Sequence, residues 1–142
     1  MKFLKVLLIS SLLLFMGCSS KYQKYINYSG SNSAIVEGDL GNFFKIMVGD
    51  SANIRIIRID NKEVKTLSLS RRVSPGIHYL NLYINGAGTQ GTIKVKLYVK
   101  PNNHYKFIAK SKGNKFIVYL YNITNSQKKL IKTYTIKKDY MF

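Results

Sequence analysis

The chain of 142 residues is poor in the residue types that most catalytic and metal sites require. It has one cysteine, two histidines, two prolines, six acidic residues and no tryptophan. A single thiol, Cys18, excludes an internal disulfide. His78 and His104 have no further cysteine to join them, and zinc sites usually take three or four protein ligands. No serine occupies a nucleophile elbow and no glycine-rich loop opens a helix, so we expect no enzyme activity, no metal and no cofactor.

The few carboxylates are also scattered along the chain. Only Glu37 and Asp39 lie close together, beside Gly38 and Gly41 in a predicted loop. Carboxylate oxygens are the ligands that calcium prefers, so a calcium role is conceivable, but we favour a solvated turn. We interpret His78 as a packing or hydrogen-bonding residue, because it has no ligand partners in the sequence around it.

The first twenty residues have the pattern of an export signal. Lys2 and Lys5 form a basic start, and residues 6–16 are apolar except for two serines. This length fits the apolar part of a secretory signal, whereas a membrane-spanning helix needs about 20 residues. The segment Leu-Phe-Met-Gly-Cys-Ser-Ser at 14–20 then places Cys18 directly after Gly17.

This segment resembles the lipobox of bacterial lipoproteins. The resemblance implies that residues 1–17 are removed as a signal peptide and that the thiol of Cys18 carries a diacylglycerol, with a further acyl chain on the new amine. Ser19 in the next position implies, for a Gram-negative cell, the outer membrane with the protein facing the periplasm. Two alternatives stay open: an ordinary signal peptide with a chance cysteine, and an uncleaved anchor.

Positive charge is the main compositional feature of the chain. The formal net charge is +17, and residues 1–17 contain two lysines and no acid, so their removal leaves +15. Such a charge attracts anionic surfaces, which in an envelope are lipid headgroups, lipopolysaccharide, acidic glycans or cell-wall polymers. Export argues against nucleic acid, the usual partner of a basic protein. Alternatively, the charge only keeps the protein soluble.

Residues 18–33 are rich in Ser, Asn, Gly and Lys, which predicts a lipidated tether. Tyr22, Tyr25 and Tyr28 recur in it at every third position. They could stack on a sugar or lie at a membrane interface. We favour tyrosines that dock the tether against its own domain.

Residues 34–142 predict a single all-β domain. Residues 93–100 alternate strictly, with apolar side chains at the odd positions and Lys94, Lys96 and Lys100 at three of the four even ones. Alternation of period two is the pattern of a half-buried antiparallel strand. Further candidate strands are 53–60, 67–73, 77–85, 105–110, 116–123 and 130–137, which are separated by turn-forming residues. Seven or eight short strands predict an antiparallel, immunoglobulin-like sandwich.

The three lysines of residues 93–100 are the candidate polyanion contacts. Alternation places Lys94, Lys96 and Lys100 on the solvent side of one strand. Lysines on exposed strands also discourage pairing between sheets of different molecules, and we weight this structural role above ligand binding.

Two short motifs carry a second resemblance. One is the hairpin Ile-Asp-Asn at 59–61, and the other is Val-Ser-Pro-Gly-Ile-His at 73–78, which opens a strand. Together with His104-Tyr105-Lys106-Phe107-Ile108, they resemble the PEGA-type module and similar small envelope lipoproteins over residues 54–110. The resemblance implies a small β-sandwich without catalytic activity.

We therefore expect a non-enzymatic, membrane-anchored envelope lipoprotein that binds an anionic envelope component or a partner protein through a basic, tyrosine-rich sandwich. A structural accessory of a larger envelope complex, without a ligand of its own, is the alternative. A small outer-membrane β-barrel is a third and disfavoured possibility, because the candidate strands are short and a narrow lumen would have to hold many unpaired lysines.

Overall fold

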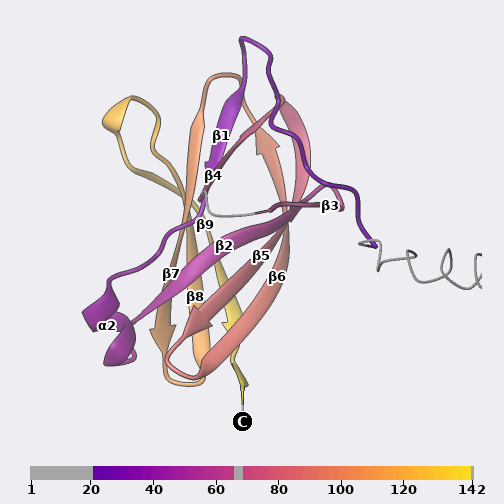
Figure 1. Cartoon of the computed structure of the whole chain (residues 1–142). Coiled ribbons are helices and arrows are strands. Elements are labelled where there is room, and N and C mark those ends of the chain that lie inside the picture. Colours follow the sequence, from indigo (N-terminus) through magenta and orange to yellow (C-terminus); the bar gives the residue numbers. More distant parts are fainter. Residues whose placement is uncertain (1–20, 66–68, 142) are drawn as a thin grey trace, which may run out of the picture.

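The computed structural model describes residues 21–65 and 69–141. The predicted signal peptide 1–17 and the predicted lipidation site Cys18 lie outside this range. The described chain forms strands wrapped around one core, with a short helix, α2, at one end (Figure 1). Within these ranges no helix is both long enough and apolar enough to span a lipid bilayer.

Ten strands make up the described fold, which confirms the all-β prediction. In chain order they are β1 (Ala34–Glu37), β2 (Ser51–Ile59), β3 (Lys62–Glu63), β4 (Ser70–Val73), β5 (Gly76–Gly86), β6 (Thr89–Val99), β7 (His104–Lys112), β8 (Lys115–Asn122), β9 (Lys129–Lys137) and β10 (Asp139–Tyr140). The helix α2 (Phe43–Met47) lies between β1 and β2, and the 3₁₀ turn η1 (Thr124–Ser126) lies between β8 and β9. The seven candidate ranges correspond to β2 and to β4 through β9. The count exceeds the expected seven or eight because β1, β3 and β10 have only four, two and two residues and are too short to produce an alternating pattern.

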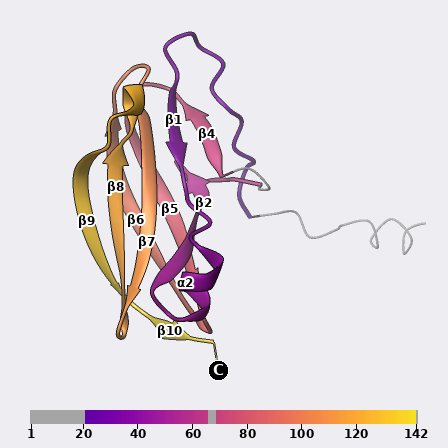
Figure 2. The same ribbon diagram turned by 90° about the vertical axis from the view of Figure 1, so that its left-hand side faces the viewer.

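The strands form one mixed sheet that turns over on itself at β2. The first two residues of β2 pair with β7, whereas the rest of the strand pairs with β5. One half therefore contains β10, β6, β5, β2 and β3, and the other contains β4, β1, β7, β8 and β9. In Figure 2 strands β7, β8 and β9 lie in front of β5 and β6, so that two layers enclose the apolar side chains as in a sandwich.

One pairing differs from the purely antiparallel prediction. Strand β1 runs parallel to β7, with Val36 opposite Tyr105 and Glu37 opposite Lys106. Parallel neighbours need a long crossover instead of a hairpin, and here all of β2 to β6 lies between the two strands. Because β1 has only four residues, its sequence could not reveal its partner or its direction.

The core consists of the inward-facing residues of the long strands. The largest fully buried side chains are Phe107, Phe116, Ile54, Ile59, Leu80, Leu82, Ile84 and Leu120. Burying a side chain of this kind stabilises the folded state by about 1.5–3 kcal/mol. Burial at these positions therefore provides most of the free energy that favours folding. Their alternation with exposed residues along β5, β6 and β8 is the pattern expected from the sequence.

The two-residue turn between β2 and β3 follows from its side chains. Asp60 and Asn61 have φ values of 50° and 63°, a left-handed pair typical of a type I′ hairpin turn. Asp and Asn tolerate this conformation better than most residues because their short polar side chains bond to nearby backbone groups. The turn was expected from the sequence at this position.

The helix α2 was not expected, because the sequence shows no helical period there. It has only five residues, and Asn42 caps it by accepting a hydrogen bond from the backbone N–H of Lys45 at 3.2 Å. A capped single turn gives no amphipathic repeat by which it could be recognised.

The described part of the tether, residues 21–33, lies along β3 and β4. The backbone N–H of Tyr25 donates to Glu63 O at 2.7 Å, and its hydroxyl donates to Arg72 O at 2.6 Å. The N–H of Tyr28 also donates to Arg72 O, at 3.1 Å. The ring of Tyr25 packs against the core, so at least this tyrosine docks the segment against its own domain as we expected.

Candidate functional site

The three predicted lysines lie on the outer side of the β5–β6 half of the sheet. Lys94 and Lys96 are exposed residues of β6, and Lys100 is exposed just after the strand ends. Val95, Leu97 and Val99 between them are buried. The predicted separation of lysine and apolar faces is therefore confirmed, whereas the ligand role of the lysines stays a prediction.

Neighbouring strands add arginine and tyrosine to the same face. Across the β5–β6 ladder Lys94 lies opposite Asn81 and Lys96 lies opposite Tyr79, and on the other side of β5 Arg58 lies opposite Asn81. We call this surface the basic face; its members are Arg55, Arg58, Tyr79, Tyr83, Lys94, Lys96, Tyr98 and Lys100. Cations and tyrosine rings thus alternate over three adjacent strands.

Cations of the basic face lie against aromatic rings. The ammonium of Lys94 is 5.4 Å from the ring centre of Tyr79, and the guanidinium of Arg55 is 5.7 Å from that of Tyr83. Arg58 lies 4.0 Å from the ring of Tyr22 in the docked tether. These distances are within the range of cation–π attraction, which contributes about 0.5–1 kcal/mol at exposed sites. The rings therefore restrain cationic side chains that would otherwise move freely in solvent.

The lysines of this face are not neutralised by carboxylates. In the described part of the chain, none of Lys94, Lys96 and Lys100 makes an ion pair. The acidic residue Asp60 lines a small hollow of about 200 Å³ together with Asn61, Tyr79 and Lys94. Its carboxylate is already engaged, because Oδ1 accepts the N–H of Tyr79 at 2.8 Å and Oδ2 contacts His78. The lysines therefore present positive charge that no ion pair of the described chain compensates, whereas Arg58 lies opposite Glu63 of β3.

His78 is buried and connects the two motifs of the PEGA-type resemblance. Its Nδ1 lies 2.6 Å from Asp60 Oδ2, and its Nε2 lies 2.7 Å from Ser74 O. The imidazole thereby ties the turn after β2 to the Ser-Pro-Gly segment that precedes β5. This confirms that His78 is a hydrogen-bonding residue, as the sequence led us to expect.

The close acidic pair Glu37 and Asp39 is neutralised within the fold. Lys106 Nζ lies 3.2 Å from Glu37 Oε1 and 3.3 Å from Asp39 Oδ1, and His104 Nε2 lies 2.6 Å from Glu37 Oε2. Burial lowers the pKa of Lys106, but the hydrogen bonds to both carboxylates outweigh it, so that the pKa is raised. The prediction of a solvated loop was wrong for Glu37, which is the last residue of β1. Glu37 and Asp39 together hold the ammonium group of Lys106. Among the described residues, no group of three or more His, Cys, Asp or Glu could hold a metal ion.

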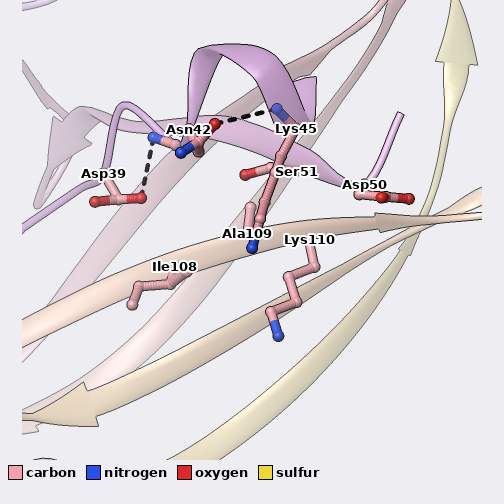
Figure 3. A pocket seen from close by; sticks show the side chains of 9 residues that line it. Asp39, Asn42, Lys45, Asp50, Ser51, Ile108, Ala109 and Lys110 are labelled. Atoms are coloured by element: carbon pink, nitrogen blue, oxygen red, sulfur yellow. Dashed lines mark hydrogen bonds between the residues drawn. The ribbon is translucent and has the colours of Figure 1, made fainter. Parts of the chain in front are cut away.

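A hollow of the described surface lies under α2 (Figure 3). It has a volume of about 440 Å³. In Figure 3 the side chain of Lys45 extends from the helix toward Ala109 on β7. Asp39 is held in place by the N–H of Gly41 at 3.0 Å. The lining residues are Asp39, Gly41, Asn42, Lys45, Asp50, Ser51, Ile108, Ala109 and Lys110, a mixed set without a converging group of catalytic side chains.

The opposite layer carries a second set of tyrosines. Tyr119 and Tyr121 on β8 stack with ring centres 6.2 Å apart. Lys110 lies 5.6 Å from the ring of Tyr119, and Lys128 lies 4.3 Å from that of Tyr121. This face repeats the lysine–tyrosine pairing without arginine, and its ladder is shorter.

Sequence reasoning found the lysines of the basic face but missed Arg55 and Arg58. Their positions in the segment Ile-Arg-Ile-Ile-Arg-Ile have a spacing of three, which does not fit a strand of period two. A register shift between Ile56 and Arg58 explains this spacing, since a bulge inserts one residue and returns the next to the same face. An arginine spacing of three inside a β-rich segment was the available signal.

No known protein family, no curated protein and no solved structure matches this chain.

Proposed function

We propose that this protein is a non-enzymatic envelope lipoprotein, anchored through Cys18, that binds a polyanionic envelope component through its basic face. The observation that carries the proposal is the set of cations on one sheet surface that contact tyrosine rings, with lysines that make no ion pair among the described residues. Four cations, Arg55, Arg58, Lys94 and Lys96, are spread over β2 and β6. A polyanion of extended shape would contact several of them at once.

Two observations support the anchored arrangement. The lipobox pattern ends at Cys18, and the chain from residue 21 onward is docked along β3 and β4 through Tyr25 and Tyr28. The tether also reaches the basic face itself, because Tyr22 lies against Arg58. The PEGA-type resemblance is part of the same proposal, and it is supported by the contact between its two motifs, Asp60 and His78.

The test uses a polyanion without a lipid, so that membrane insertion cannot contribute. The full chain in neutral detergent is passed over immobilised polyphosphate. We expect retention that weakens with salt, because the Debye length falls from about 10 Å at 0.1 M to about 3 Å at 1 M. Replacing Lys94, Lys96 and Lys100 with Gln should weaken binding about 100-fold, at about 1 kcal/mol for each lysine near an anionic surface.

The matched control changes the same number of charges elsewhere. Lys128, Lys129 and Lys132 are exposed residues at the start of β9, and their replacement with Gln should have a much smaller effect. Equal losses in the two triple variants would mean that net charge alone acts and that the basic face is no site. Lack of retention at low salt would favour the alternative, a structural accessory without a ligand of its own.

A further inference from the structure

The segment around α2 exposes an unusual amount of apolar surface. None of the five residues of the helix is buried. The exposed fractions are 57 % for Leu40, 69 % for Phe43, 77 % for Phe44, 65 % for Met47 and 73 % for Val48. We call these five residues the α2 tip. Large contiguous apolar patches are rare on soluble monomers and mark sites of interaction.

Backbone and polar contacts fix the shape of the tip, because its five apolar side chains are exposed and do not pack into the core. Asn42 caps the helix, the N–H of Val48 donates to Phe44 O at 3.2 Å, and the N–H of Asp50 donates to Lys45 O at 2.8 Å. The N–H of Ser111 on β7 donates to Asp50 O at 3.3 Å, which ties the end of the loop to the sheet. Phe43 and Phe44 meet edge to face, with ring centres 5.8 Å apart. The fold thus holds two phenylalanine rings outward on a braced loop.

Lysines surround the same end of the molecule. The β7–β8 hairpin lies toward the same end as α2 in both Figure 1 and Figure 2. Lys45 and Lys110 line the hollow under the helix. Lys138 bonds to Ser111 and to Gly113 O, at the turn of the hairpin, and Lys115 pairs with Lys137 across β8 and β9. The lysines at this end are Lys45, Lys110, Lys112, Lys115, Lys137 and Lys138, against the acids Asp50 and Asp139; Asp39 is occupied by Lys106.

We propose that the α2 tip inserts into the interface of an anionic lipid bilayer, with the surrounding lysines on the headgroups. Apolar side chains on one side of a short helix and a surplus of cations around it are the two components of interfacial membrane binding. Each lysine near an anionic leaflet adds to the attraction, and its long aliphatic stem can extend from the apolar level to the headgroups. The charge of this end matches a lipid surface better than it matches an apolar protein groove. The inference does not depend on the basic face.

The absence of tryptophan from the chain makes a direct test available. A Phe44→Trp variant of the full chain carries one tryptophan, which is placed in the tip. After reconstitution into vesicles of phosphatidylglycerol and phosphatidylcholine, its emission should shift to shorter wavelength. Lipids brominated near the headgroup end of their acyl chains should quench most of it. Vesicles of phosphatidylcholine alone should give a smaller shift and weaker quenching, because the lysines then lack partners.

A Tyr98→Trp variant is the matched control. Tyr98 is 63 % exposed but lies on the basic face, near the far end of β6. Its emission should remain that of a solvated tryptophan in both kinds of vesicle. Quenching of Tyr98→Trp without quenching of Phe44→Trp would overturn the proposal and would place the membrane contact on the basic face. Because the polyphosphate experiment contains no bilayer, its failure and the failure of this proposal are separate results.

Two other outcomes would also overturn the proposal. Emission from Phe44→Trp that stays solvent-like in both kinds of vesicle would leave the tip without a lipid contact. A shift that occurs without vesicles and grows with protein concentration would identify a second copy of the chain as the occupant. To confirm that phenylalanine itself drives insertion, Phe43→Ser combined with Met47→Trp should lose most of the quenching that Met47→Trp alone shows.

Discussion

His78 shows how one buried polar side chain can join two turns. Its ring is 7 % exposed, and it contacts a carboxylate on one side and a backbone carbonyl on the other. Buried polar groups that lose a partner cost about 1–3 kcal/mol, and Ser74 O and Asp60 Oδ2 would both lose their contact with this ring if His78 were replaced. Replacement of His78 should therefore destabilise the fold, although we assign this residue no catalytic role.

His78→Leu should lower the free energy of unfolding by about 1–3 kcal/mol, measured by urea denaturation. The control is His104→Leu, because His104 is more exposed and its contact with Glu37 is shared with Lys106. That variant should lose about 1 kcal/mol or less, as is usual for ion pairs near the surface. Equal losses in the two variants would contradict the bridging role of His78.

Tyr25 gives the stability of the docked tether a dependence on pH. Burial, with a smaller contribution from the charge of Asp60 and an opposing one from Arg71, raises the pKa of Tyr25 from 10.0 to about 12. A pKa that is higher in the folded state means that the contribution of the neutral hydroxyl is complete below pH 10 and is lost as pH rises toward 12. The hydroxyl is also the donor to Arg72 O.

The stability difference between the unaltered chain and Tyr25→Phe should therefore be constant below pH 10 and should shrink between pH 10 and 12. Guanidinium denaturation at several pH values measures it, and taking the difference removes the titration of the lysines. A difference that stays constant up to pH 12 would show that the hydroxyl of Tyr25 titrates alike in the folded and unfolded chains.

At the scale of the element, the exposed phenylalanine rings of α2 should contribute to membrane binding but little to the stability of the fold. None of its residues is buried, so the backbone cap and not the core determines its shape. We expect Phe43→Ser and Phe44→Ser together to change the free energy of unfolding by about 0.5 kcal/mol or less, as is usual at exposed positions. Thermal unfolding followed by circular dichroism tests this. A loss of several kcal/mol would mean that the two rings pack against the domain.

The elements differ in how far the sequence could predict them. In β6 each buried residue alternates with a lysine, tyrosine or threonine, so its face and its exposed lysines followed directly from the pattern. β1 has four residues and depends on β4 and β7 for its place, which no local pattern records. The bulge in β2 moved Arg58 onto the basic face, and a bulge leaves only a break in the alternation. Long-range pairing and local register shifts account for what could not be predicted.

At the scale of the whole molecule, the lipid anchor is the prediction with the largest effect. Cys18→Ser should either remain unprocessed or leave the membrane and appear in the soluble exported fraction, because the acyl chains supply the anchor. Cell fractionation with metabolic labelling by a radioactive fatty acid distinguishes the two outcomes. A processed Cys18→Ser protein that stays on the membrane would show that another surface, such as the α2 tip, is sufficient for attachment.

The parallel pairing of β1 with β7 bears on the order in which this chain can fold. Strands β5 and β6 are joined by a tight turn and pair along their whole length, so that this hairpin can form within microseconds. Strand β1 must wait until β7 exists, and closing so long a loop is entropically slow. During synthesis from the N-terminus, residues 34–37 can pair with β4 once residue 73 has emerged, but they lack β7 until the chain has passed residue 104. The fold is thus completed only when most of the chain has been synthesised.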